Sequence, residues 1–194
     1  MARAGAACGT AALLALTGCS PGSSSSPEAA PFSSGPAHTI STPAQLGSFT
    51  RDPSLEKELN VAGLQEQVAQ GGSGRTSDVL SAVYVQGSGT PGAGGTQQIF
   101  MFVGGHLANS NPAVSIASFE RTYPDTRAVS AGSLGGKAAC VMTTVSHDSV
   151  AMCVWFDNDS FGTLVSPTMS MATLAKTLDA VRPGIERPAP ALGT

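Results

Sequence analysis

The sequence predicts an α+β domain. We expect an antiparallel meander sheet of about five strands with two to three helices on one face, forming a two-layer sandwich. Three observations predict this class. Short segments rich in Val, Thr, Phe and Tyr are separated by turn residues, as is typical of strands. Two other segments combine a capping residue, apolar residues at helical spacing and a following proline. Two cysteines also flank one turn at a spacing that fits a hairpin.

The N-terminus has the features of an export signal. Arg3 supplies a positive charge, and residues 6–17 are largely apolar but too short to span a bilayer as a helix. The run ends in Leu16-Thr17-Gly18-Cys19, which resembles a bacterial lipobox. The resemblance implies cleavage before Cys19 and acylation of its sulfur, which would anchor the protein by lipid on the extracytoplasmic face of the cell membrane. A secretory peptide without an anchor and a cytoplasmic start are the alternatives.

We expect four regions along the chain. Residues 1–18 form the lipoprotein signal peptide. Residues 19–50 are rich in Ser, Pro and Ala and form a disordered tether, because they bury too little apolar surface to offset their ordering entropy. The reach of such a tether is on the order of 30 Å. Residues 51–186 form one globular domain and residues 187–194 a flexible tail.

The first half of the domain contains a weak helix and two strands. Pro53 to Ala69 spaces leucines for a helix, and residues 78–86 and 97–103 are interpreted as strands. The connection between the strands contains a Gly-x-Gly-x-x-Gly pattern. A proline lies inside this pattern and a strand follows it, so we interpret it as a linker and not as a nucleotide site.

The second half begins with a hairpin. Residues 141–145 and 150–156 are strand-like, and a two-residue turn at positions 146 and 147 would place Cys140 opposite Cys153. Cys8 would leave with the signal and Cys19 would be acylated, so an even pair remains, which favours a disulfide in an exported domain. Two free thiols, a metal pair and a longer turn with a shifted register remain alternatives.

Two helices and one further strand complete the domain. Asn111 caps a helix that begins at Pro112 and stops before Pro124. Residues 161–166 form the strand that follows the turn at 157–160. Ser170 caps the last helix, which Pro183-Gly184 ends; its apolar positions follow helical spacing and are Met171, Leu174, Ala175, Leu178 and Val181.

The sequence contains no cofactor or metal motif. A net charge of −3 argues against a nucleic-acid partner. Asp157-Asn158-Asp159 resembles the start of a calcium loop, but Phe161 and Thr168 stand where oxygen ligands are needed, which favours a turn. His106 and the pair His147-Asp148 are candidates for a Ser/His/Asp site, although loop polarity is the favoured interpretation because no nucleophile motif is present.

Two aromatic residues are weak candidates for ligand binding. Trp155 shares a strand face with Cys153, and Tyr84 lies in an earlier strand. Packing in the core is the favoured interpretation for both. Four methionines suit either an adaptable apolar groove or core packing; they are Met142, Met152, Met169 and Met171.

The last third of the chain supports a family resemblance. The residues that carry it are Gly132-Ser133-Leu134-Gly135-Gly136-Lys137, Cys140, Cys153-Val154-Trp155, Asp157, Gly162 and the closing helix to Arg182. Together with the lipobox they resemble a group of actinobacterial surface lipoproteins of unknown function. The resemblance implies an envelope address and a hairpin disulfide, and it implies no catalytic residue.

The sequence therefore favours a non-enzymatic, lipid-anchored domain that binds a small ligand or an envelope protein. An envelope hydrolase with a Ser/His/Asp site assembled from distant residues is one alternative, and a structural envelope spacer is another. A nucleophilic Ser beside a His would favour the hydrolase. An apolar pocket near Trp155 would favour binding over the spacer.

Overall fold

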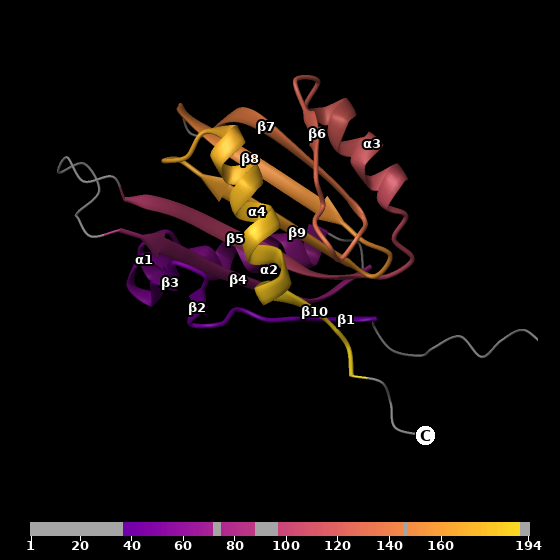
Figure 1. Ribbon diagram of the computed structural model, residues 1–194, viewed down its shortest axis with the longest axis horizontal. Coiled ribbons are helices and arrows are strands. Elements are labelled where there is room, and N and C mark those ends of the chain that lie inside the picture. The colour runs from indigo at the N-terminus through magenta and orange to yellow at the C-terminus, as the bar shows by residue number, and fades with distance from the viewer. Residues whose placement is uncertain (1–36, 72–74, 88–96, 146, 191–194) are drawn as a thin grey trace, which may run out of the picture. The chain divides into compact units, whose positions relative to one another are not determined.

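An eight-stranded antiparallel sheet forms the framework of the protein (Figure 1). The computed structural model describes residues 37–71, 75–87, 97–145 and 147–190, all within the compact unit Ser34–Thr194. The strand order is β2-β3-β4-β5-β9-β8-β7-β6. In chain order the strands are β2 (Gln45–Leu46), β3 (Phe49–Arg51), β4 (Thr76–Gln86), β5 (Gln98–Leu107), β6 (Arg127–Val129), β7 (Lys137–Val145), β8 (Asp148–Phe156) and β9 (Ser160–Ser166).

Two further strands and four helices complete the elements. β1 (His38–Ile40) pairs with β10 (Glu186–Pro188) in a separate two-stranded sheet. The helices are α1 (Pro53–Glu58), α2 (Val61–Gly71), α3 (Pro112–Thr122) and α4 (Met171–Ile185). None of the helices in the described part of the chain is long and apolar enough to cross a membrane.

The α+β class and the antiparallel sheet are confirmed, but the predicted five strands and two to three helices are too few. A simple meander is also wrong, because β9 returns to pair with β5. Short strands such as β2, β3 and β6 have only two or three residues, too few to show an alternating pattern.

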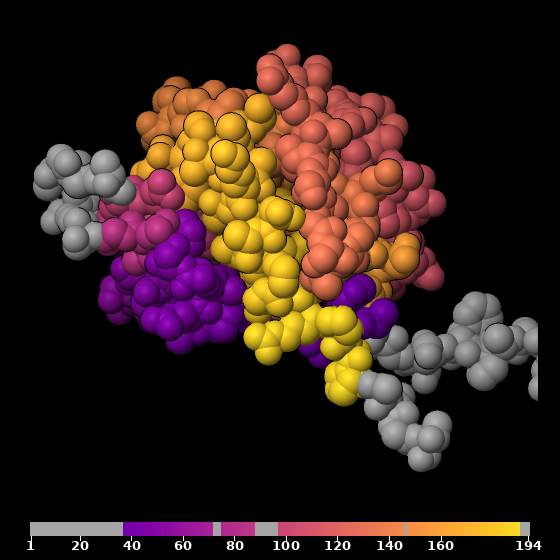
Figure 2. All heavy atoms as spheres, in the orientation of Figure 1, coloured from indigo at the N-terminus to yellow at the C-terminus, as the bar shows by residue number. Residues whose placement is uncertain are grey.

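The helices cover both faces of the sheet, so the predicted two-layer sandwich is wrong. On one face α4 packs against Tyr84, Phe102 and Trp155, and Figure 2 shows this helix lying across that face. On the other face Val61 of α2 packs against Val83, and Ile116 of α3 belongs to a third apolar cluster on β7 and β8. Adjacent residues such as Val83 and Tyr84 are both buried, and neighbours in a strand point to opposite faces, which requires a layer on each side.

The disulfide hairpin has the predicted register. Cys140 lies opposite Cys153, with a Cα–Cα distance of 4.0 Å, and the two form a disulfide. The register continues to Val145 opposite Asp148, which leaves a two-residue turn. His147 in that turn has a φ of 81°. A single register therefore fixes both the turn and the disulfide.

Helix starts are confirmed more closely than helix ends. The side chains of Asn111 and Ser170 cap α3 and α4 by accepting backbone N–H groups. The predicted helix from Pro53 to Ala69 divides into α1 and α2 at Asn60, which has a φ of 50°. Pro183 does not end α4, which continues to the fully buried Ile185.

The folded region extends beyond the predicted boundaries at both ends. Residues 38–50 contain three strands where a tether was expected, and β10 includes Arg187 and Pro188 of the expected tail. Each of these strands is short. The segment between β1 and β2 also contacts the large sheet, because the phenolic O–H of Tyr84 in β4 donates to Pro43 O at 2.9 Å. Burial raises the pKa of Tyr84 to about 12. The predicted signal peptide, Cys19 and the Gly-rich linker centre lie outside the described residues.

Candidate functional site at the end of the last helix

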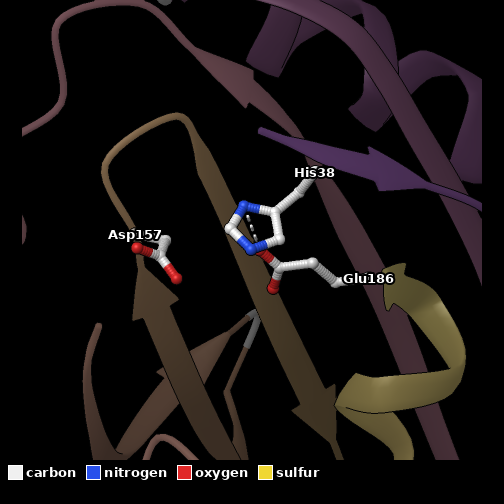
Figure 3. Close-up of side chains that lie close together, drawn as sticks. All are labelled: His38, Asp157 and Glu186. Atoms are coloured by element: carbon white, nitrogen blue, oxygen red, sulfur yellow. Dashed lines mark ion pairs between the residues drawn. The ribbon is translucent and has the colours of Figure 1, made fainter. Parts of the chain in front are cut away.

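The most concentrated group of ionisable side chains lies where α4 ends against the β8–β9 turn. α4 contributes Arg182, β10 contributes Glu186, and β1 contributes His38. Asp157 and Asp159 come from the turn. Figure 3 shows the imidazole of His38 between the carboxyl groups of Asp157 and Glu186. His38 is more than 100 positions away from the other four residues in sequence, so only the tertiary fold brings it to them.

Arg182 is the centre of this group, which we call the Arg182 cluster, and only 1% of it is exposed. Its Nε donates to Glu186 at 2.7 Å, and one terminal nitrogen donates to Asp157 at 3.0 Å. The other terminal nitrogen donates to the carbonyl oxygens of Ala131 and Gly135. The guanidinium also lies 5.7 Å from the ring centre of Trp155. One cation thus joins α4, the β8–β9 turn and the loop before β7.

Glu186 is fully buried, and both its carboxylate oxygens accept hydrogen bonds. One oxygen accepts from Arg182 and from the indole N–H of Trp155, and the other accepts from the hydroxyl of Ser160. Asp157 is 6% exposed and accepts from Arg182 and from the backbone N–H of Asn158. A buried charge without partners is very unfavourable, so this saturation is what allows both carboxylates to be buried.

His38 attaches β1 to the cluster. Its backbone N–H donates to one oxygen of Asp159 at 3.0 Å, and its Nδ1 lies 2.8 Å from the other. Nδ1 also lies 3.6 Å from Glu186. Burial by itself raises the pKa of Asp159, but the side-chain and backbone hydrogen bonds from His38 outweigh it and hold that pKa below its ordinary value.

The donor set poses the question of a metal ion. Ligand atoms of His38, Asp157 and Glu186 lie within 4.8 Å of one another, and two carboxylates with an imidazole suit several divalent metals. The two carboxylates, however, already share the guanidinium of Arg182. A divalent ion placed among them would lie beside this fixed positive charge and would have to displace its hydrogen bonds. The arrangement therefore fits an internal ion network and does not fit a metal site.

The hydrolase candidates are not assembled. His106 Nδ1 is buried without a hydrogen-bond partner among the described residues, and His147 is exposed in the hairpin turn. The hydroxyl of Ser160 is fully buried and donates to Glu186 instead of a histidine. In the described part of the chain no histidine nitrogen bonds a serine hydroxyl. Among the described residues, therefore, no serine hydroxyl is activated by a histidine as a triad requires.

The two aromatic candidates belong to the core. Trp155 and Tyr84 are both fully buried and pack in the same apolar cluster, with Phe102 and Phe100 stacked against them respectively. Core packing, the favoured interpretation for both residues, therefore describes them, and neither side chain is exposed to a ligand. The indole also lies over Gly162, where an added Cβ would meet the ring at 2.1 Å.

Sequence reasoning missed Arg182, Glu186 and His38 as a group. One signal was available: the apolar positions Leu174 and Leu178 are four residues apart, and the next step of four reaches Arg182 and then Glu186. Charged residues on the buried stripe of a helix indicate an internal ion pair. His38 gave no such signal because it lies among residues with the composition of a tether.

Open depressions lie elsewhere on the surface. One of about 410 Å³ lies beside α1 and α2. Its lining combines polar and apolar residues, namely Arg51, Glu56, Lys57, Asn60, Gln65 and Ser81 with Pro53, Val61 and Ala62. Another of about 450 Å³ is lined by Pro124, Asp125, Thr126, Arg127, Met142 and Met171. Of the four methionines considered for a groove, Met142 and Met171 therefore share one, whereas Met169 is in the core.

Comparison of the chain with protein families, curated proteins and solved structures gives no match of any of the three kinds.

Proposed function

We propose that this protein is an envelope lipoprotein, attached through Cys19 to the outer face of the cell membrane, whose folded domain binds a small ligand or an envelope protein. The observation that carries the binding proposal is the closed state of the Arg182 cluster. Its buried groups are used to hold the fold, so they offer a substrate neither a free base nor a nucleophile. The Cys140–Cys153 disulfide also suits an exported protein.

The depression beside α1 and α2 is the proposed binding surface. It presents charges of both signs together with amide and hydroxyl groups. Within it, Arg51 and Glu56 hold each other through two hydrogen bonds, of 2.6 and 3.0 Å. The hydrogen bond to Arg51 lowers the pKa of Glu56, which keeps the carboxylate charged. A surface that joins these charged groups to the apolar Pro53, Val61 and Ala62 suits a small molecule with both polar and apolar parts.

Anchoring is tested by intact mass spectrometry of the membrane fraction, before and after reduction and alkylation. The expected product starts at Cys19, carries a diacylglyceryl mass, and gains two alkylated thiols only after reduction. The matched control is Cys19→Ala, which should leave the chain unacylated and uncleaved. A wild-type chain without lipid would refute the anchored address.

Binding is tested by thermal unfolding of the full chain with a panel of amino sugars, phosphorylated sugars and short peptides. A ligand present at about 100 times its Kd stabilises the folded state by about 2.7 kcal/mol. We expect Lys57→Glu in the depression to abolish such a shift and Lys137→Glu on β7 to retain it. A shift that survives Lys57→Glu would place the ligand elsewhere.

A further inference from the structure

The outer edge of β7 is only partly covered. β6 pairs only with residues 138–140 of β7, and its first residue, Arg127, lies opposite Cys140. Figure 1 shows β6 beside β7. The residues that precede Arg127 form a turn outside the sheet, in which the N–H of Thr126 donates to Tyr123 O. Residues 141–145 therefore have β8 on one side and no described strand on the other.

The hairpin register shows which backbone groups face this open edge. The close Cα approach of Cys140 and Cys153 marks a non-hydrogen-bonded pair, so the N–H and C=O of Cys140 point away from β8 and toward β6. The period of two then directs the N–H and C=O of Met142 and Thr144 the same way. Past the end of β6, no described strand pairs with these four groups, and Met142 shares a depression with residues 124–127.

The open edge lacks the features that usually protect a sheet edge. Residues 141–145 are Val-Met-Thr-Thr-Val, with no charged residue and no proline. Met142 is 44% exposed and Val145 is 53% exposed, and both belong to the small group of large exposed apolar residues in the described chain. This edge therefore combines unpaired backbone groups with exposed apolar side chains.

We propose that two copies of this chain associate through this edge, with β7 pairing antiparallel to β7 of the second copy across a two-fold axis at Thr143. In this register Met142 lies opposite Thr144 of the second copy, and by symmetry Thr144 lies opposite Met142 of the second copy. Both members of each pair have their N–H and C=O directed outward, so each pair can exchange two hydrogen bonds. Val145 then lies opposite Val141 of the second copy, which covers its exposed side chain.

Charge complementarity favours a second copy as the occupant. β6 ends at the exposed Arg127, and in this register the hairpin end of the second copy, with its exposed Asp148, stops next to that position. The axis makes the same contact twice. Arg127 beside one end of the uncharged strand and Asp148 at the other make the strand complementary to itself at these two contacts, as an isologous contact requires; Asp125 is also exposed on the Arg127 side.

The size of the edge sets the expected strength. Five residues span about 17 Å. Pairing along this short edge buries less surface than the about 1,600 Å² of a standard stable interface. We therefore expect a weak, concentration-dependent dimer. Sharing one membrane would raise its population, but the pairing itself rests on the folded unit and not on the proposed function.

Sedimentation of the full chain, isolated from membranes in detergent, tests the proposal. We expect a monomer–dimer equilibrium with a dimer Kd below about 1 mM. Thr144→Pro removes an outward N–H from each copy without touching the bonds to β8, and Met142→Lys places charges at the axis. Each should raise the dimer Kd roughly tenfold or more. Val114→Lys on α3, which replaces an even more exposed apolar residue, should leave the Kd unchanged.

A cross-link tests the register. Thr143→Cys places two thiols opposite each other on the axis, and mild oxidation should give a disulfide-linked dimer that the unsubstituted chain does not form. Cys19→Ala should keep the dimer, because the edge belongs to the folded unit. A chain that stays monomeric at about 1 mM, a dimer insensitive to both edge variants, or one that needs Cys19 would each overturn the proposal.

Discussion

Replacing Arg182 by methionine is the sharpest test of the Arg182 cluster. The substitution keeps much of the side-chain volume but removes the hydrogen bonds to Glu186, Asp157 and two backbone carbonyls. Glu186 is fully buried and Asp157 is 6% exposed, so two carboxylates lose the guanidinium that pairs with both of them in a site that water hardly reaches. Removing one partner of a buried ion pair costs about 3–5 kcal/mol. That is a large part of the about 5–15 kcal/mol that stabilises an ordinary domain.

The expected fall in Tm is roughly 6–20 °C for a domain of this size. Trp155 is the single tryptophan of the chain, and its indole donates to Glu186, so its fluorescence reports directly on the cluster. Urea unfolding followed by that fluorescence gives the free energy of unfolding. Arg187→Met, an exposed arginine five residues along, is the matched control and should change that energy by less than about 0.5 kcal/mol.

A double-mutant cycle separates the ion pair from general packing. Glu186→Gln removes one charge, and in the Arg182→Met background it removes a charge that has already lost its partner. The double variant should therefore lose less free energy of unfolding than the sum of the losses of the two single variants. The difference, which is the coupling energy, should be at least about 1 kcal/mol. Independent effects, or an Arg182→Met variant that loses less than about 1 kcal/mol, would refute the view that the cluster holds the fold together.

Three further predictions concern stability. Replacing Cys140 and Cys153 together by alanine should lower the free energy of unfolding by about 3 kcal/mol, since the disulfide closes a short loop; an unchanged urea midpoint after reduction would contradict this. The folded-state pKa of Asp159 is lowered, so its stabilisation is present above the unfolded pKa of about 3.9 and is lost as pH falls through the folded value. The wild type should therefore lose stability relative to Asp159→Asn below about pH 4, and parallel acid unfolding curves would count against the assignment. Gly162→Ala places a methyl group against the ring of Trp155 and should cost about 1–3 kcal/mol with a change in indole emission; wild-type stability and emission would show that the ring can move.

Local signals in the sequence predicted the local structure well. The hairpin register, the disulfide and the caps at Asn111 and Ser170 depend on residues close together in the chain, and each has a simple geometric rule. The same rules failed at Pro183, because they do not weigh the burial of Ile185 after the proline or the i, i+4 pairing of Arg182 with Glu186 across it.

Long-range pairing was beyond the sequence. β1 pairs with β10 over more than 140 residues, and its three residues have the composition of a tether. The return of β9 to β5 likewise left no local pattern. The prediction of helices on one face only was wrong, because the helices cover both faces. A strand buried on both faces has a continuous apolar run and not an alternation, and this signal was not used. The His38 attachment could be recognised only once β1 was in place.

Several of the residues on which the lipoprotein resemblance was based lie around Arg182. Gly135 offers its carbonyl oxygen to the guanidinium, Asp157 pairs with it, and Trp155 lies against it. Gly162 leaves the space that the indole fills. These positions are those that a buried ion network needs in order to form, whatever the surface binds. Because these residues hold the fold together, they carry no information about a ligand, which must be sought in exposed residues such as Lys57 and along the edge of β7.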